Sequence, residues 1–274
     1  MNMKSLTFEA ITTFSLARQP FGVDMIRSFI EHWPAEIALN AIVEGSSSIT
    51  VTKHKSRLKV AEFSECCSFH ATFKEHFKKV QGWRFKGQES VPFLFDAVRF
   101  AHKVFAIDHV IRSSSADVLI WLDADVVTHA GIPLDLLSTD LDPESGWSFL
   151  GRSHLSAVSG GLDYPECGFM MFYPKARGFQ RFWQLMRYFY FEFGLYGLFE
   201  WHDSFVFQQA FALTRTDFPE FGFDISGLGL VDVGDPSHVF IASKLGEFMD
   251  HKKGARKDSK FSKEFIRRQE LLPD

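Results

Sequence analysis

The sequence predicts a single α/β domain whose central sheet is mixed, mainly parallel and flanked by helices. Three observations support this prediction. A strand–helix–strand pattern opens the chain, a long helical pattern precedes a strongly apolar strand in the middle, and strand and helix patterns follow in the second half. Such alternation is typical of sheets covered by helices. Because no repeat or linker divides the 274 residues, we expect one domain over 1–274.

The first elements form the strand–helix–strand unit. SLTFEAITTFS, residues 5–15, predicts a strand that ends near Ser15. GVDMIRSFIEHWP, residues 22–34, has apolar residues at helical spacing and ends at a proline. EIALNAIVEG, residues 36–45, alternates like a second strand, and the unit favours a right-handed parallel crossover. Residues 46–90 are polar and mixed, and we expect helices and loops there.

The middle of the chain predicts a helix followed by a buried strand. FLFDAVRFAHKVFAIDHVI, residues 93–111, fits a long helix with Arg99 and Lys103 four residues apart on one face. A run of three serines breaks this pattern, and the strand DVLIWL, residues 117–122, follows. Further along, we expect strands at WSFLGR (147–152) and ECGFMMFYP (166–174), a helix over 177–193, and another helix opening near Asp203.

Composition excludes several classes of protein. The net charge of −4 gives no general attraction to nucleic acid. The N-terminal stretch lacks an apolar core of signal-peptide length, and no run approaches the roughly 18 apolar residues of a membrane span. Residues 182–201 predict a partly buried helix, although peripheral contact with a membrane surface stays open. Three cysteines make neither a disulfide framework nor a zinc spacing, so we expect a cytoplasmic protein.

Two aspartates, Asp123 and Asp125, stand at the end of the apolar strand. Ligands of α/β sheets collect at the carboxyl ends of strands, and two carboxylates so placed suit Mg²⁺ or Mn²⁺. Two alternatives stay open. Asp123 could cap a turn while Asp125 pairs with a lysine, or Asp123 could be a nucleophile, since DADVV matches D-x-D-x-[TV] of the haloacid-dehalogenase-like phosphatases. That phosphatase motif usually opens its domain, whereas more than a hundred residues precede it here.

A late segment adds a third candidate metal ligand. HKKGARK, residues 251–257, contains His251, whose neutral imidazole can complete a site begun by two carboxylates. Gly254 would let the backbone approach a diphosphate, and Lys257 would neutralise phosphate charge. Taken alone, the segment is more typical of a solvated basic tail with an incidental histidine, but together with the aspartates it predicts a metal and phosphate site.

The combination of D-x-D and a late H-x-x-G-x-x-K resembles the GT-A glycosyltransferases, and is similar to the glycogenin and lipopolysaccharide galactosyltransferase group. The resemblance implies the Rossmann-like GT-A fold, with about 1–127 as the nucleotide-binding half. About 128–274 would form the acceptor side, and its basic tail would close on the diphosphate. It also implies Mn²⁺ or Mg²⁺ on Asp123, Asp125 and His251, and a nucleotide-sugar donor, with UDP expected. The acceptor would be a glycan, a lipid-linked sugar or another hydroxyl compound.

Further roles follow from this resemblance. Ser15 sits where the family begins its nucleotide pocket, and Arg99 or Lys103 where it places a basic residue against the donor. Asp203 is the candidate general base, with the cap of the following helix as its alternative role. Glu166 is the second candidate catalytic carboxylate, beside an acceptor or sugar hydroxyl, with a structural hydrogen bond as its alternative role.

The chain departs from the family pattern where Asp258 replaces a proline and where PECGF (165–169) lacks an asparagine. Two other functions stay open: a phosphatase that uses Asp123, and a non-catalytic sugar-nucleotide-binding protein on the same fold.

Overall fold

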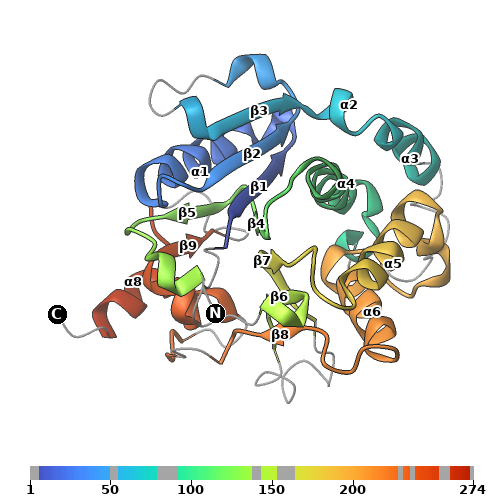
Figure 1. Cartoon of the computed structure of the whole chain (residues 1–274). Helices are drawn as coiled ribbons and strands as arrows, with labels where there is room; N and C mark the ends of the chain where they lie inside the picture. Colours follow the sequence, from blue (N-terminus) through green and yellow to red (C-terminus); the bar gives the residue numbers. More distant parts are fainter. Residues whose placement is uncertain are drawn as a thin grey trace.

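A seven-stranded sheet forms the centre of the computed structural model (Figure 1). The structure describes residues 6–49, 55–78, 92–137, 143–152, 164–227, 231–234, 238–252 and 260–271. The order across the sheet is β3-β2-β1-β4-β7-β6-β8. These strands are β1 (Phe8–Phe14), β2 (Ala38–Val43), β3 (Leu58–Glu62), β4 (Val118–Leu122), β6 (Trp147–Leu150), β7 (Glu166–Phe172) and β8 (Phe223–Asp224).

The sheet is mixed and mainly parallel, as predicted. β1 pairs in parallel with β2 and β4, β2 with β3, and β6 with β8. β7 is antiparallel to both of its neighbours, β4 and β6. A second, two-stranded sheet joins β5 (Val126–Thr128) to β9 (Met249–His251) in antiparallel register. The smaller sheet therefore ties a late segment of the chain to the residues that follow β4.

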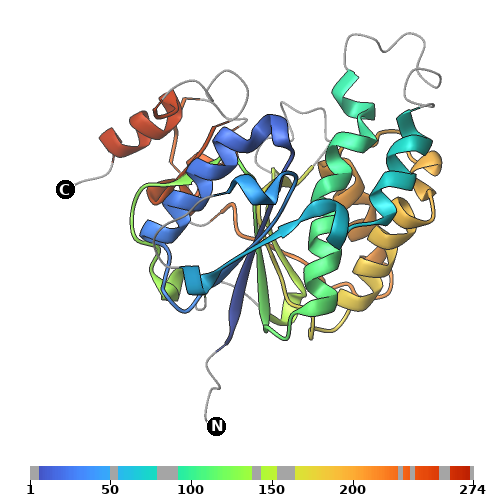
Figure 2. The same ribbon diagram turned by 90° about the horizontal axis from the view of Figure 1, so that it is seen from above.

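Helices cover both faces of the central sheet. Helix α1 lies on one face, whereas α3, α4, α5 and α6 lie on the other, as Figures 1 and 2 both show. The helices are α1 (Gln19–His32), α2 (Phe63–Cys66), α3 (Phe69–Lys78), α4 (Ala97–Ser113), α5 (Phe179–Phe191), α6 (Asp203–Arg215), α7 (Val239–Ala242) and α8 (Lys263–Leu271). This arrangement separates two hydrophobic cores, one on each side of the sheet.

Strand β4 contributes to both cores. Val118, Ile120 and Leu122 pack into the core beside α1. Leu119 and Trp121 pack into the core beneath α4 and α5. Because neighbouring side chains of a strand point to opposite faces, a strand buried on both sides becomes a continuous apolar run. The sequence LIWLDAD thus changes from apolar to acidic where the strand leaves the two cores.

Three predicted elements need correction. Leu58–Glu62 is the edge strand β3, although we expected helices and loops over 46–90. The predicted helix 93–111 begins later, at Ala97, because Asp96 caps it and accepts a hydrogen bond from the backbone N–H of Arg99 at 3.1 Å. The predicted helix over 182–201 ends at Phe191, the last residue of α5.

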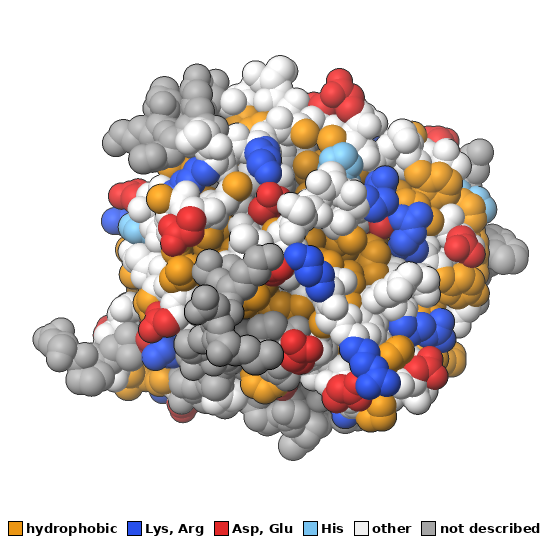
Figure 3. All heavy atoms as spheres, viewed as in Figure 1, with side chains coloured by type: hydrophobic (Ala, Val, Ile, Leu, Met, Phe, Trp, Pro, Cys, Tyr) orange, Lys and Arg blue, Asp and Glu red, His pale blue; other side chains and the backbone are white. Residues whose placement is uncertain are grey.

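The surface carries no dominant charge of one sign in the view of Figure 3, where basic and acidic side chains are interspersed among hydrophobic ones. This distribution agrees with the small net charge of −4. Among the described residues, the helices are all too short or too polar to cross a membrane.

Candidate metal and nucleotide site

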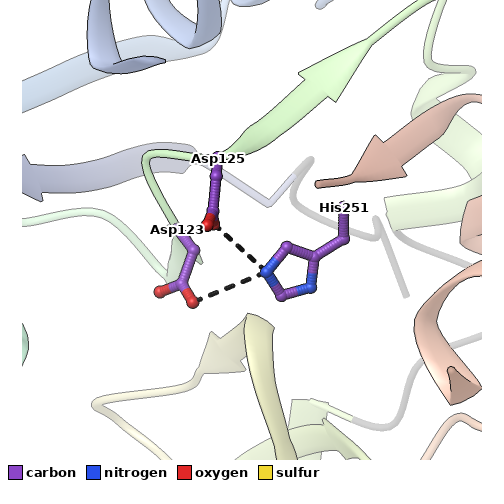
Figure 4. A group of neighbouring side chains, drawn as sticks. All are labelled: Asp123, Asp125 and His251. Carbon is purple, nitrogen blue, oxygen red and sulfur yellow. Dashed lines mark ion pairs between the residues drawn. The ribbon is translucent and has the colours of Figure 1, made fainter. Parts of the chain in front are cut away.

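Asp123, Asp125 and His251 meet at the end of β4 (Figure 4). Nε2 of His251 lies 3.2 Å from Oδ1 of Asp125 and 3.8 Å from Oδ2 of Asp123. The candidate ligand atoms of the three residues all lie within 4.8 Å of one another. The pairing of β5 with β9 produces this cluster, because it sets Val126 opposite His251. The three side chains predicted as metal ligands are therefore brought together.

Backbone hydrogen bonds hold the cluster in place. The N–H of Asp123 donates to the carbonyl of Gly168 in β7 at 3.0 Å, and the N–H of Lys252 donates to the carbonyl of Asp125 at 2.9 Å. His251 packs directly over Gly168, where an ideal Cβ would lie only 2.4 Å from the imidazole Cε1. Only a residue without a side chain leaves room for the ring, so glycine is needed here to seat His251 beside the aspartates.

Lys103 of α4 joins two of the acidic residues. Its Nζ lies 3.0 Å from Oδ1 of Asp123 and 2.5 Å from Oδ2 of Asp203, and it donates to the carbonyl of Cys167 at 2.9 Å. Burial alone would lower the pKa of Lys103, but the negative charges of Asp123 and Asp203 outweigh it and raise the pKa well above its usual value. Lys103 thus forms two hydrogen bonds, to Asp203 and to the carbonyl of Cys167, and an ion pair with Asp123.

The two oxygens of Asp123 have different environments. Oδ1 faces Lys103 and accepts a hydrogen bond from Nε1 of Trp121 at 2.8 Å, whereas Oδ2 faces His251. Burial raises the pKa of Asp123; Lys103 opposes this rise and the neighbouring charge of Asp125 adds to it. Two crowded carboxylates with an imidazole suit a divalent cation, and the nitrogen ligand favours Mn²⁺ over the oxygen-preferring Mg²⁺. The residues present thus fit the implied metal.

A cavity of about 470 Å³ opens beside this cluster. It lies at the carboxyl ends of β1 and β4 and along α4, the place where α/β sheets bind ligands. Four residues that the sequence predicts as donor contacts line it: Ser15, Arg99, Lys103 and Asp123. Arg18 and three phenylalanines line it as well and were not predicted: Phe14, Phe21 and Phe100. A cavity lined by aromatic, basic and acidic side chains beside a candidate cation site suits a nucleotide diphosphate.

Comparison with known proteins gives structural matches only. No family model matches the chain, and no curated protein matches it by sequence. The solved structure of the bifunctional glycosyltransferase WbbM aligns with 100% of this chain and 51% of its own, at 13% identity and a TM-score of 0.52. Glycosyltransferase GlyE of Streptococcus pneumoniae TIGR4 aligns with 97% of this chain and 60% of its own, at 12% identity and a TM-score of 0.50.

The chain has the GT-A glycosyltransferase fold. It spans about half to three-fifths of the length of these two solved structures. The expected fold class is confirmed, and with it the predicted resemblance to GT-A glycosyltransferases at the level of fold.

Within this GT-A fold, Asp203 lies in the cavity wall at the first position of α6. The helix cap is its neighbour His202, whose side chain accepts from the N–H of Phe205. Burial would raise the pKa of Asp203, but the charge and hydrogen bond of Lys103 prevail and lower it. Asp203 is therefore an ionised carboxylate in the wall of the cavity.

Glu166 takes a different position. It is buried at the start of β7, is only 2% exposed, and is not among the residues that line the cavity. Its Oε2 accepts from Nη2 of Arg152 at 2.5 Å, and its Oε1 accepts from the N–H of Gly168 at 3.1 Å. The catalytic role of Glu166 thus remains a prediction. Its carboxylate contacts Arg152, Gly168 and His251, which are not among the residues that line the cavity.

The predicted diphosphate contacts Gly254 and Lys257 lie outside the described residues, so their roles also remain predictions. Arg18 was missed because it carries no motif: it follows β1 in a short 3₁₀ turn, Leu16–Arg18, and only the folded strand end directs it to the cavity. Its one sequence signal is a basic residue just after the first strand.

Proposed function

We propose that this chain is a metal-dependent glycosyltransferase that moves a hexose from a nucleotide-sugar donor, most simply a UDP-sugar, to a hydroxyl of a glycan, lipid-linked or other acceptor. One observation carries the proposal: two aspartates and a histidine converge beside a cavity at the strand ends of a GT-A fold. A divalent cation held by Asp123, Asp125 and His251 would neutralise the charge of the donor diphosphate.

Different residues of the cavity would bind different parts of the donor. Ser15 and the aromatic wall of the cavity would bind the nucleoside, while Arg18 and Arg99 are the cavity cations for phosphate oxygens. Within the described ranges neither arginine forms an ion pair, and the guanidinium of Arg99 lies over the ring of Phe100, 5.5 Å from its centroid, so both cations can turn toward a ligand. Lys103 is buried and already contacts Asp123, Asp203 and the carbonyl of Cys167, so we assign it to orienting the two aspartates rather than to direct contact with phosphate.

Asp203 is the proposed catalytic carboxylate. It lines the cavity and Lys103 holds it ionised, so it can stabilise positive charge that develops on the sugar or accept a proton from the acceptor hydroxyl. Because a lowered pKa weakens a base, the electrostatic role is the better supported of the two.

Calorimetry with UDP in the presence of Mn²⁺ tests the proposal. We expect Asp125→Ala to abolish metal-dependent UDP binding while the variant keeps its far-UV circular dichroism spectrum. Asp24→Ala is the control, since Asp24 is a 66% exposed aspartate of α1 that pairs only with a neighbouring arginine of the same helix. Unchanged UDP affinity in Asp125→Ala would refute the assignment of the metal site. A thermal-shift screen of UDP- and GDP-sugars with Mn²⁺ then identifies the donor.

Assays on the purified protein, together with the geometry of the site, distinguish the two alternative functions. A phosphatase would form a phosphoaspartyl adduct at Asp123 and release phosphate from simple phosphoesters. The GT-A fold counts against it, as does the engagement of Oδ1 of Asp123 by Lys103 and Trp121. A non-catalytic binding protein would bind the donor and show neither sugar transfer nor slow donor hydrolysis.

A further inference from the structure

His251 has two ring nitrogens in two different buried environments. Nε2 faces the two aspartates, while Nδ1 lies 3.5 Å from Oε1 of Glu166. His251 is 1% exposed and Glu166 2% exposed, so water does not reach this contact freely. Within the described part of the chain, Nδ1 has no hydrogen-bond partner at this separation. The ring therefore presents an unsatisfied polar atom to a buried carboxylate.

The chemistry of imidazole determines what this carboxylate can do. If Nε2 is to bind a cation, its lone pair must be free, and the single ring proton of a neutral imidazole must then sit on Nδ1. A buried N–H needs an acceptor, and Oε1 of Glu166 is the charged acceptor that faces it. The 3.5 Å separation is long for a hydrogen bond, and a small rotation of the ring would close it.

Arg152 stabilises Glu166 in this position. Its Nη2 donates to Oε2 at 2.5 Å, and the N–H of Gly168 donates to Oε1 at 3.1 Å, so the carboxylate is fixed on both sides. Gly168 is also the residue over which His251 packs. The imidazole thus lies between the glycine surface beneath it, the aspartates at one edge and Glu166 at the other.

We infer that Glu166 is a positioning residue for His251: it accepts the Nδ1 proton, fixes the tautomer that leaves Nε2 free for a cation, and is itself held by Arg152. This inference rests on the proposed metal site and assigns Glu166 a role that acts through His251 instead of on the substrate. Removing such an outer partner of a metal-bound histidine typically costs about ten- to a hundred-fold in metal affinity.

Two measurements test the inference. The first is ¹⁵N NMR of metal-free protein labelled on histidine, at a pH where the imidazole is neutral, with the His251 signals assigned from a His251→Gln variant. In wild type we expect Nδ1 protonated and Nε2 unprotonated; in Glu166→Ala the shifts should move toward a mixture of tautomers. The second is Mn²⁺ titration followed by electron paramagnetic resonance, where Glu166→Ala should bind about ten- to a hundred-fold more weakly.

Three further variants separate positioning from folding. Glu166→Gln keeps the side-chain size and one acceptor oxygen, so we expect an intermediate loss of Mn²⁺ affinity. Arg152→Gln/Glu166→Gln removes the buried ion pair as a unit; its unfolding temperature should lie close to wild type while its Mn²⁺ affinity stays reduced. Glu220→Ala, at an exposed glutamate near the end of α6, is the control and should change neither measurement.

The outcomes distinguish this inference from the proposed function. If wild-type protein binds no Mn²⁺, the proposed metal site is refuted. The NMR measurement would still test whether Glu166 fixes the tautomer of His251. Conversely, wild-type protein that binds Mn²⁺, with folded Glu166 variants that keep both its tautomer and its affinity, would overturn the inference and leave the metal site intact.

Discussion

Gly168→Ala adds a single methyl group, which the structure predicts to damage the proposed metal site. The added Cβ would lie 2.4 Å from Cε1 and 2.5 Å from Nδ1 of His251, whereas ordinary contact begins at 3.4 Å. The imidazole must therefore retreat by about 1.0 Å, the difference between 3.4 and 2.4 Å. Metal–ligand distances tolerate only about 0.2 Å of variation, so His251 would no longer reach a cation shared with the aspartates.

We expect Gly168→Ala to weaken Mn²⁺ binding by at least ten-fold and up to about a hundred-fold. On the free-energy scale this is about 1.4 to 2.8 kcal/mol of binding. Calorimetric titration with Mn²⁺ measures the loss, and circular dichroism and thermal unfolding establish that the variant is folded. Gly131→Ala is the matched control, because nothing lies within 4 Å of a Cβ at Gly131. A folded Gly168→Ala protein with wild-type Mn²⁺ affinity would refute the reasoning, and so would an equal loss in the control.

Two further predictions concern charge. Lys103→Met should destabilise the fold by about 3–5 kcal/mol in urea unfolding, because it leaves Asp123 and Asp203 without their cation. Lys103→Met/Asp203→Asn should recover part of this loss. If the losses of the two single variants simply add in the double variant, the pairing is contradicted. The hydrogen bond from Lys175 lowers the pKa of Asp117 from 3.8 to about 2, so this carboxylate stabilises the fold above pH 3.8 and loses its contribution as the pH falls toward 2. The difference in unfolding free energy between wild type and Asp117→Asn should be on the order of 1 kcal/mol at pH 6, because the ion pair of Lys175 and Asp117 is partly exposed to solvent. The difference should narrow between pH 5 and 2. A difference that does not depend on pH would contradict the lowered pKa of Asp117.

The sequence predicts those elements whose signal lies within the element itself. The buried strand β4 and the helices α1 and α4 have long apolar patterns, and the structure confirms all three. β3 was missed because an edge strand is only half covered: Lys59 is exposed and Glu62 half-buried, so no apolar run marks it. β5 and β9 have three residues each and pair across more than a hundred residues of chain, which leaves no local pattern to detect.

In the candidate site, too, residues with a local sequence signal were predicted, whereas contacts between distant segments were not. Asp123 and Asp125 are visible at once, because a buried strand ends in two charges, and His251 is visible through its spacing to a glycine and a lysine. Lys103 was predicted as a donor contact, yet its partners come from three separate segments, and no local pattern reveals that it already pairs with two carboxylates and a carbonyl. Sequence can therefore place a cation near the site, but only the fold shows which charges it already serves.

The charge balance of the site links the metal to the donor. Asp123, Asp125 and Asp203 contribute three carboxylates against the single ammonium group of Lys103, which leaves two negative charges when His251 is neutral. A diphosphate alone would be repelled by this negative charge, although Arg18 and Arg99 also line the cavity. A divalent cation cancels the excess and adds ligand positions for phosphate oxygens. Under the proposed function, the same carboxylates that would repel a nucleotide sugar in the metal-free protein would therefore make its binding depend on the metal.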